Sequence, residues 1–181
     1  MTARVLIPLS ICAILGALFG AAYFGGSSLL PSLRGTDAVA IVDAPEKGKR
    51  APLFDLPDSG EGRVRLAEYG NEPLIILFFA TWNSEAADQL KILDDYRMGG
   101  GLVRSIAIAS QEEKTIVSSF IRRGGYTVPV ALDQRGATSE AYGIKSLPTL
   151  FFIGRDSIIH DIAIGVLSEQ QIGDRAERIL E

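Results

Sequence analysis

The sequence predicts an α/β domain in which a central mixed sheet is covered by helices on both faces. Continuous apolar runs, typical of strands buried on both sides, alternate along the chain with segments of helical periodicity. Such an alternation indicates a sheet between helical layers. A β-hairpin is expected before this sheet and one transmembrane helix before the whole domain.

The N-terminal segment, residues 1–33, is predicted to be a membrane anchor. Arg4 is the only charged residue before Arg34, so positions 5–33 are 29 consecutive uncharged residues. The strongly apolar stretch 5–24 has the roughly 20 residues that a helix needs to cross a bilayer. We therefore expect the chain to contact the membrane through residues 5–24.

A cleaved signal peptide is the alternative for this segment, and Gly20-Ala21-Ala22 offers it a cleavage site. The apolar run is longer than a usual signal core, which favours a retained anchor. Cys12 lies inside the run and is expected to face lipid as a small apolar side chain. Short N-terminal anchors usually export the domain that they carry, so the rest of the chain is expected outside the cytoplasm, as a single-pass protein (on the periplasmic side if the cell is Gram-negative).

Residues 34–50 mix charge, glycine and proline without a sustained period, and we interpret them as a tether. The domain proper is expected over residues 51–181, enough for one core. From residue 34 onward the chain has 17 basic and 22 acidic residues, a net charge of −5. This balance gives no electrostatic reason to bind nucleic acid.

The strands are predicted from short apolar or alternating runs. Two of them flank the turn-rich sequence PDSGEG and indicate a hairpin. The strands are expected at residues 53–56, 63–66, 74–80, 103–109, 130–132, 149–153 and 158–164.

The helices are predicted from apolar stripes and their end signals. Ser168 and Gln171 form a capping-box pattern for the last helix. The expected inward residues are Ala87, Leu90, Leu93 and Arg97 of a helix over 84–98; Ile116, Val117, Phe120 and Ile121 of a helix ending at Gly124; and Ile172, Ala176, Ile179 and Leu180 of the last. A further short helix is expected over 137–142.

The cysteine and histidine counts exclude several chemistries. One cysteine cannot form an intramolecular disulfide, and with one histidine it cannot supply a four-ligand zinc site. We therefore expect no metal and no cofactor.

Two short sequences carry a resemblance to a known family. Ala80-Thr81-Trp82 follows the expected strand LIILFF, and Leu147-Pro148-Thr149 begins another. With APLFDL, RVRLAEY and ALDQRGATSEAYGIKSLPTLFFIGRD, their order resembles the membrane-anchored thioredoxin-like proteins (redoxins) of the TlpA and ResA type, over nearly all of residues 51–181. The resemblance implies a thioredoxin-like fold, a Cys-x-x-Cys sequence directly after Trp82, and a cis proline at Pro148 that faces it.

The sequence departs from the family where the resemblance would place both cysteines. Asn83-Ser84-Glu85-Ala86 stands there instead. Thiol–disulfide exchange needs a thiolate that attacks a disulfide sulfur, and neither an amide nor a methyl group can do this. We predict no catalytic residue. A serine nucleophile at Ser84 would need a base within reach, and His160 is the only histidine.

The same four residues also suit the beginning of a helix. Thr81 and Asn83 are residue types that cap helix N-termini. Glu85 is expected in the first turn, where the helix dipole stabilises its charge. We interpret the degenerate tetrad as a structural helix start.

The function expected from these observations is a redox-inactive, membrane-tethered protein-binding or assembly module. Its candidate peptide-binding surface consists of Trp82, Leu147, Pro148 and Thr149, where an extended peptide would add as a strand to backbone groups of Leu147 and Thr149 that are left unpaired. The expected partner is an exported or membrane protein. The alternative is a thiol–disulfide oxidoreductase of the TlpA/ResA type, acting in cell redox homeostasis or cytochrome c maturation, and a third candidate is a structural member of a membrane complex.

Overall fold

The computed structural model describes residues 45–181. The predicted anchor over 1–33, Cys12 and most of the predicted tether lie outside the described residues. Within residues 45–181, no helix is both long enough and apolar enough to span a bilayer.

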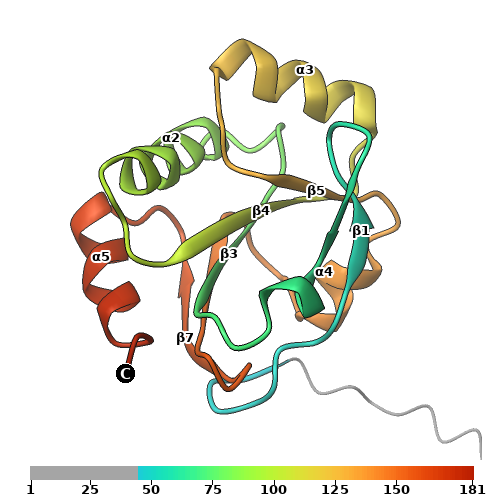
Figure 1. The fold of residues 1–181 in the computed structure, drawn as a ribbon. Helices are drawn as coiled ribbons and strands as arrows, with labels where there is room; N and C mark the ends of the chain where they lie inside the picture. Colours follow the sequence, from blue (N-terminus) through green and yellow to red (C-terminus); the bar gives the residue numbers. More distant parts are fainter. Residues whose placement is uncertain (1–44) are drawn as a thin grey trace, which may run out of the picture. The chain divides into compact units, whose positions relative to one another are not determined.

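A five-stranded mixed sheet forms the centre of the domain, as the sequence predicts (Figure 1). Its strand order is β5-β4-β3-β6-β7. Strand β4 pairs in parallel with β3 and with β5, whereas β6 pairs antiparallel with β3 and with β7. The bounds are β3 Leu74–Phe79, β4 Arg104–Ser110, β5 Val130–Asp133, β6 Thr149–Ile153 and β7 Ile159–Ile164.

The central strand β3 is buried along its whole length, because each face of the sheet carries its own core. Successive side chains of a strand point to opposite faces. Ile75, Leu77 and Phe79 therefore pack in one cluster, and Leu74, Ile76 and Phe78 in the other.

Helices cover one face of the sheet, and a mixed layer covers the other. The first face packs against α2 Ala86–Met98, α3 Lys114–Gly124 and α5 Glu169–Glu177, with α2 and α5 side by side (Figure 1). The second packs against the hairpin of β1 Asp55–Pro57 and β2 Arg63–Arg65, the 3₁₀ helix η1 Leu66–Tyr69 and the loop after α4 Ala137–Ala141, which carries the buried Tyr142.

Helix α2 differs from prediction at its beginning, and α3 in the residues that it buries. Helix α2 begins at Ala86, not at residue 84, and buries Ala86 where Ala87 was expected. In α3, Val117 is buried but Ile116 is 52% exposed, so the inward stripe is narrower than predicted. The capping box of Ser168 and Gln171 at α5 is confirmed.

The folded part of the chain begins before residue 51, within the predicted tether. The Gly48 amide donates to the Ile159 carbonyl at 2.7 Å, and the Ile159 amide donates to the Lys49 carbonyl at 2.9 Å. Backbone pairing to β7 therefore holds this segment against the sheet edge.

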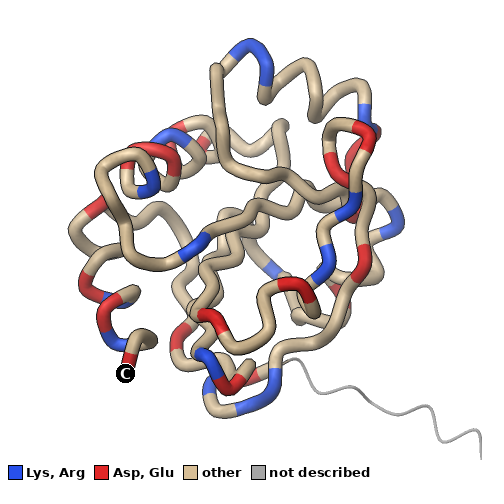
Figure 2. Tube along the Cα trace, viewed as in Figure 1, with Lys and Arg blue, Asp and Glu red and all other residues tan. Residues whose placement is uncertain are grey.

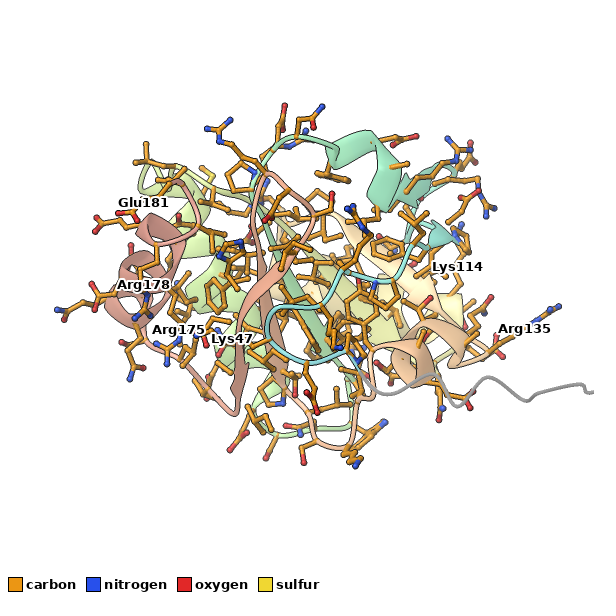
Figure 3. The ribbon with its side chains drawn as sticks, turned by 90° about the horizontal axis from the view of Figure 1, so that it is seen from below. Lys47, Lys114, Arg135, Arg175, Arg178 and Glu181 are labelled. Carbon is orange, nitrogen blue, oxygen red and sulfur yellow. The ribbon has the colours of Figure 1, made fainter. Side chains whose placement is uncertain are left out.

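Ion pairs join the same edge of the sheet to α5. Asp161 of β7 lies 3.2 Å from Arg175, 3.7 Å from Arg178 and 4.0 Å from Lys47. Figure 3 shows the three cations on the same side of the domain. Elsewhere on the surface both signs of charge are interspersed, for example along α2 and α5 (Figure 2). The cations Lys47 and Arg178 are exposed, and exposed pairs add little stability individually.

Candidate functional site

The degenerate tetrad lies in the connection between the end of β3 and the start of α2. Trp82, just before it, is 73% exposed, which is unusual for so large an apolar side chain. Ser84 and Glu85 are also exposed, whereas Ala86 is fully buried in the core beneath. Of the two positions at which the resemblance implies cysteines, the first is therefore partly accessible and the second is not.

Asn83 bridges two loops of the site through its side-chain amide. Its Oδ1 accepts a hydrogen bond from the Glu85 amide at 2.7 Å, and its Nδ2 donates to the Leu147 carbonyl at 2.7 Å. The expectation that Asn83 caps α2 is wrong, because its Oδ1 binds the amide of Glu85, which precedes the helix, and no side chain forms a capping bond there. Glu85 is the N-cap residue of α2 and does not lie in its first turn, because α2 begins one residue later.

Thr81 does not cap the helix; it binds Glu112, which follows β4. Its amide donates to Glu112 Oε2 at 2.6 Å and its hydroxyl to Oε1 at 2.5 Å. Glu112 is only 9% exposed. Sequence reasoning missed this carboxylate, and the one signal for it was an acidic residue shortly after a largely buried strand.

The Leu147–Pro148 loop lies opposite Asn83, and its peptide bond is cis, as the resemblance implies. The side chains of Pro148 and Thr149 are buried, and the Thr149 hydroxyl donates to the Ser146 carbonyl at 2.7 Å. Thr149 also pairs with both neighbouring strands. The expectation of unpaired backbone groups is therefore wrong for Thr149 and for the Leu147 carbonyl, which Asn83 occupies.

Trp82 and Leu147 nevertheless meet at a common hollow, which we call the Trp82 groove. Its volume is about 320 Å³. The lining residues are Trp82, Ser110, Gln111, Ser139, Ile144, Lys145, Ser146 and Leu147.

A buried polar network supports one wall of the Trp82 groove. Asp133, at the end of β5, accepts hydrogen bonds from the Ser139 amide and the Ser139 hydroxyl, both at 2.7 Å. Ser139 Oγ also lies 3.0 Å from Ser110 Oγ. The single proton of the Ser139 hydroxyl points to the Asp133 carboxylate. In the bond between the two serines, Ser110 is therefore the donor and Ser139 the acceptor. Sequence reasoning missed this network.

The rim of the groove contains a constrained backbone. Gln111 has a φ of +58°, a left-handed conformation that costs energy in a residue other than glycine. Gly136, beneath Gln111, has a φ of +75°, a conformation that favours glycine, and a Cβ there would displace the end of the Gln111 side chain. Strained residues of this kind cluster at functional sites.

The alternative of a Ser84–His160 pair is not formed. His160 lies 3.3 Å from Asp156, and it lines a separate hollow beside Arg178 and Glu181. The Ile158 amide and, secondarily, His160 lower the pKa of Asp156. Among residues 45–181, no three His, Cys, Asp or Glu side chains are grouped as metal ligands would be.

Comparison with known protein families shows the family of the chain. The model of the AhpC/TSA family matches residues 47–162. The chain belongs to the AhpC/TSA family.

The chain is also similar to individual proteins and to solved structures. The thiol-disulfide oxidoreductase ResA of Geobacillus thermodenitrificans is 28% identical over 136 residues, 73% of this chain and 77% of that protein. A thiol:disulfide interchange protein of Chlorobium tepidum superposes with a TM-score of 0.60 at 21% identity, covering 76% of this chain and all of that one. The exposed lipoprotein thioredoxin of Streptococcus pneumoniae gives 0.64 at 21% identity, covering 70% and 99%.

The structural neighbours show the thioredoxin-like fold, and the sequence relatives show homology to ResA thiol-disulfide oxidoreductases. Homology to ResA favours the oxidoreductase alternative over the redox-inactive interpretation. The tetrad Asn83-Ser84-Glu85-Ala86, however, contains no sulfur.

Proposed function

We propose that this AhpC/TSA member is a membrane-tethered, extracytoplasmic binding module that holds a segment of a partner protein at the Trp82 groove without exchanging electrons. The observation that carries the proposal is the combination of a 73% exposed Trp82 with a tetrad that lacks both sulfurs. Exposed aromatic side chains beside a groove are typical anchors of protein interfaces.

An extended segment in the groove could accept a backbone hydrogen bond from Leu147. Within residues 45–181 the Leu147 amide forms no hydrogen bond, while the Leu147 carbonyl is held by Asn83. A docking strand therefore finds a donor at Leu147 but no acceptor. Most of the affinity must come from side chains that pack against Trp82 and Leu147.

Crosslinking of the full chain in intact membranes tests this proposal. We expect one exported or membrane protein to be enriched, and Trp82→Ala to lower that enrichment by about tenfold or more, as for an interface hot spot. Met98→Ala is the matched control, because Met98 is 77% exposed and lies at the far end of α2. Blocking thiols beforehand should change nothing. Equal enrichment with Trp82→Ala and Met98→Ala would contradict the proposal that the partner binds at the Trp82 groove.

The tether and the location outside the cytoplasm rest on the uncharged residues 5–33 and on the relatives. The streptococcal neighbour is described as an exposed lipoprotein. Protease added to intact cells with a permeable outer layer should digest the domain, whereas a cytoplasmic marker should survive. Protection of the domain would contradict this part of the proposal.

A second candidate function, thiol–disulfide oxidoreduction, is favoured by the homology to ResA. This reaction requires a thiol, and the only thiol of the chain is that of Cys12. An insulin-reduction assay with the purified full chain decides between the two. Turnover above the uncatalysed rate, abolished by Cys12→Ser, would establish the second candidate and overturn the first.

A further inference from the structure

A second hollow, lined mainly by apolar side chains, lies beside the edge strand β7. Its volume is about 180 Å³. The apolar residues that line it are Pro45, Tyr142, Ile144, Phe151, Ile162 and Ile164. We propose that this hollow is the docking site for the chain's own residues 41–44, which have the sequence Ile-Val-Asp-Ala and directly precede the described part of the chain.

The first described residues run toward this hollow, antiparallel to β7. Arg50 forms an antiparallel bridge with Ile158, and the Gly48 amide donates to the Ile159 carbonyl. Pro45, three residues before Gly48, is buried and lies at the hollow beside the second half of β7. Lower residue numbers of this segment therefore meet higher residue numbers of β7. The same path carries residues 41–44 along the remainder of the strand.

The segment is long enough to cover the end of β7. An extended chain advances about 3.3 Å per residue, so residues 41–44 reach about 13 Å beyond Pro45. Ile162 and Ile164, which both line the hollow, are two residues and therefore about 7 Å apart along the strand. Among the described strands β7 is the outermost on this side of the sheet, so an extended segment can be added at its edge.

The side chains of residues 41–44 match the hollow and its rim. Ile164 is 72% exposed on an edge strand, and proteins normally cover such apolar edges because they otherwise associate. Ile41 and Val42 are β-branched residues, which favour strands. A cavity of about 150 Å³ takes up a benzene molecule, so about 180 Å³ accommodates one branched side chain. Lys145 also lines the hollow and offers a cation to the Asp43 carboxylate.

Covalent attachment favours this occupant over a separate protein. Residues 41–44 are joined to Pro45 at the hollow, so their docking costs no loss of translational freedom. The hollow shares Ile144, Lys145 and Ser146 with the Trp82 groove, so the docked segment supports the wall between the two. Docking requires no partner at the groove and can therefore be tested whether or not the proposed function holds.

Thiol reactivity of the full chain in detergent tests the proposal. Ile164→Cys is combined with Cys12→Ser, so that the introduced thiol is the only one in the chain. We expect this thiol to react with a maleimide about tenfold more slowly than the thiol of Met98→Cys in the same background. Met98 is 77% exposed and does not line the hollow. Adding Ile41→Asp and Val42→Asp should abolish the protection, because charged side chains do not enter an apolar hollow.

Thermal unfolding gives a second readout. Ile41→Asp with Val42→Asp should lower the unfolding midpoint by about 4 °C, since these substitutions remove apolar burial. Thr36→Asp with Ala38→Asp is the matched control, because it adds the same charge outside the proposed segment, and it should leave both the protection and the midpoint unchanged. Equal reactivity of the Ile164→Cys and Met98→Cys thiols, or protection that survives Ile41→Asp with Val42→Asp, would overturn the proposal. Protection that is lost on dilution would overturn it as well, by assigning the hollow to a second copy of the chain.

Discussion

The side-chain amide of Asn83 donates a hydrogen bond of 2.7 Å to the carbonyl oxygen of Leu147, which lies 64 positions away in the chain. Asn83 is the residue at which the resemblance to the redoxins implies the first cysteine. The Asn83 side chain therefore joins the β3–α2 connection to the cis-proline loop.

Asn83→Ala should lower the free energy of unfolding by about 1–2 kcal/mol, because it removes the bond to Leu147 and the bond to the Glu85 amide. Urea unfolding measures this change. Ser84→Ala is the control: Ser84 is exposed, and we expect a change within about 0.5 kcal/mol. Equal effects of the two substitutions would show that the Asn83 bridge adds no stability.

Glu112→Ala should destabilise the domain by about 2 kcal/mol, since it leaves the partly buried Thr81 amide without an acceptor. Glu113→Ala is a neighbouring control of the same type, because Glu113 is exposed and its carboxylate accepts from the Gln134 side chain and from no buried amide of the described residues. Thr81→Val combined with Glu112→Ala should cost less than the sum of the single changes. Additive costs would mean that the two residues do not interact.

The lowered pKa of Asp156 predicts how the stability of the domain changes in acid. The Ile158 amide lowers the pKa of Asp156 in the folded state, and His160 lowers it further. A lowered folded pKa gives stability that is complete above the unfolded value of about 3.9 and is lost as the pH falls through the folded value. The stability difference between the unchanged protein and Asp156→Asn should therefore be constant above about pH 5 and shrink below about pH 4. A difference that grows on acidification would contradict the assignment.

The sequence predicts the buried strands β3 and β6 more closely than the start of α2, for physical reasons. Strands β3 and β6 match their expected ranges within one residue, because a run buried on both faces is apolar at every position. The start of α2 is displaced because the Asn83 side chain stabilises a turn ahead of the helix. Helical periodicity does not reveal such a contact.

The candidate site is only partly predictable. Trp82 and Leu147 follow from the resemblance, and both line the groove. Glu112 and Asp133 do not follow from the sequence. A buried carboxylate of this kind can be identified only from the groups that bind it, and these lie in other segments of the chain. Thr81 is 31 positions from Glu112, and the Ser110 hydroxyl that extends the Asp133 network comes from another strand. Contacts between distant segments appear only once the sheet is assembled.

Asn83→Cys combined with Ala86→Cys should restore measurable insulin reduction to the full chain. The Ala86 amide donates to the Asn83 carbonyl at 3.1 Å, so the two positions belong to one tight turn, and cysteines there lie within the separation that a disulfide spans. The first cysteine would be partly exposed and the second buried at the start of α2, an arrangement that favours attack by the first. Asn83→Ser with Ala86→Ser controls for the loss of the Asn83 bridge. A double cysteine variant that is folded, forms the disulfide and remains inert would contradict the assignment of this tetrad to the family's redox position.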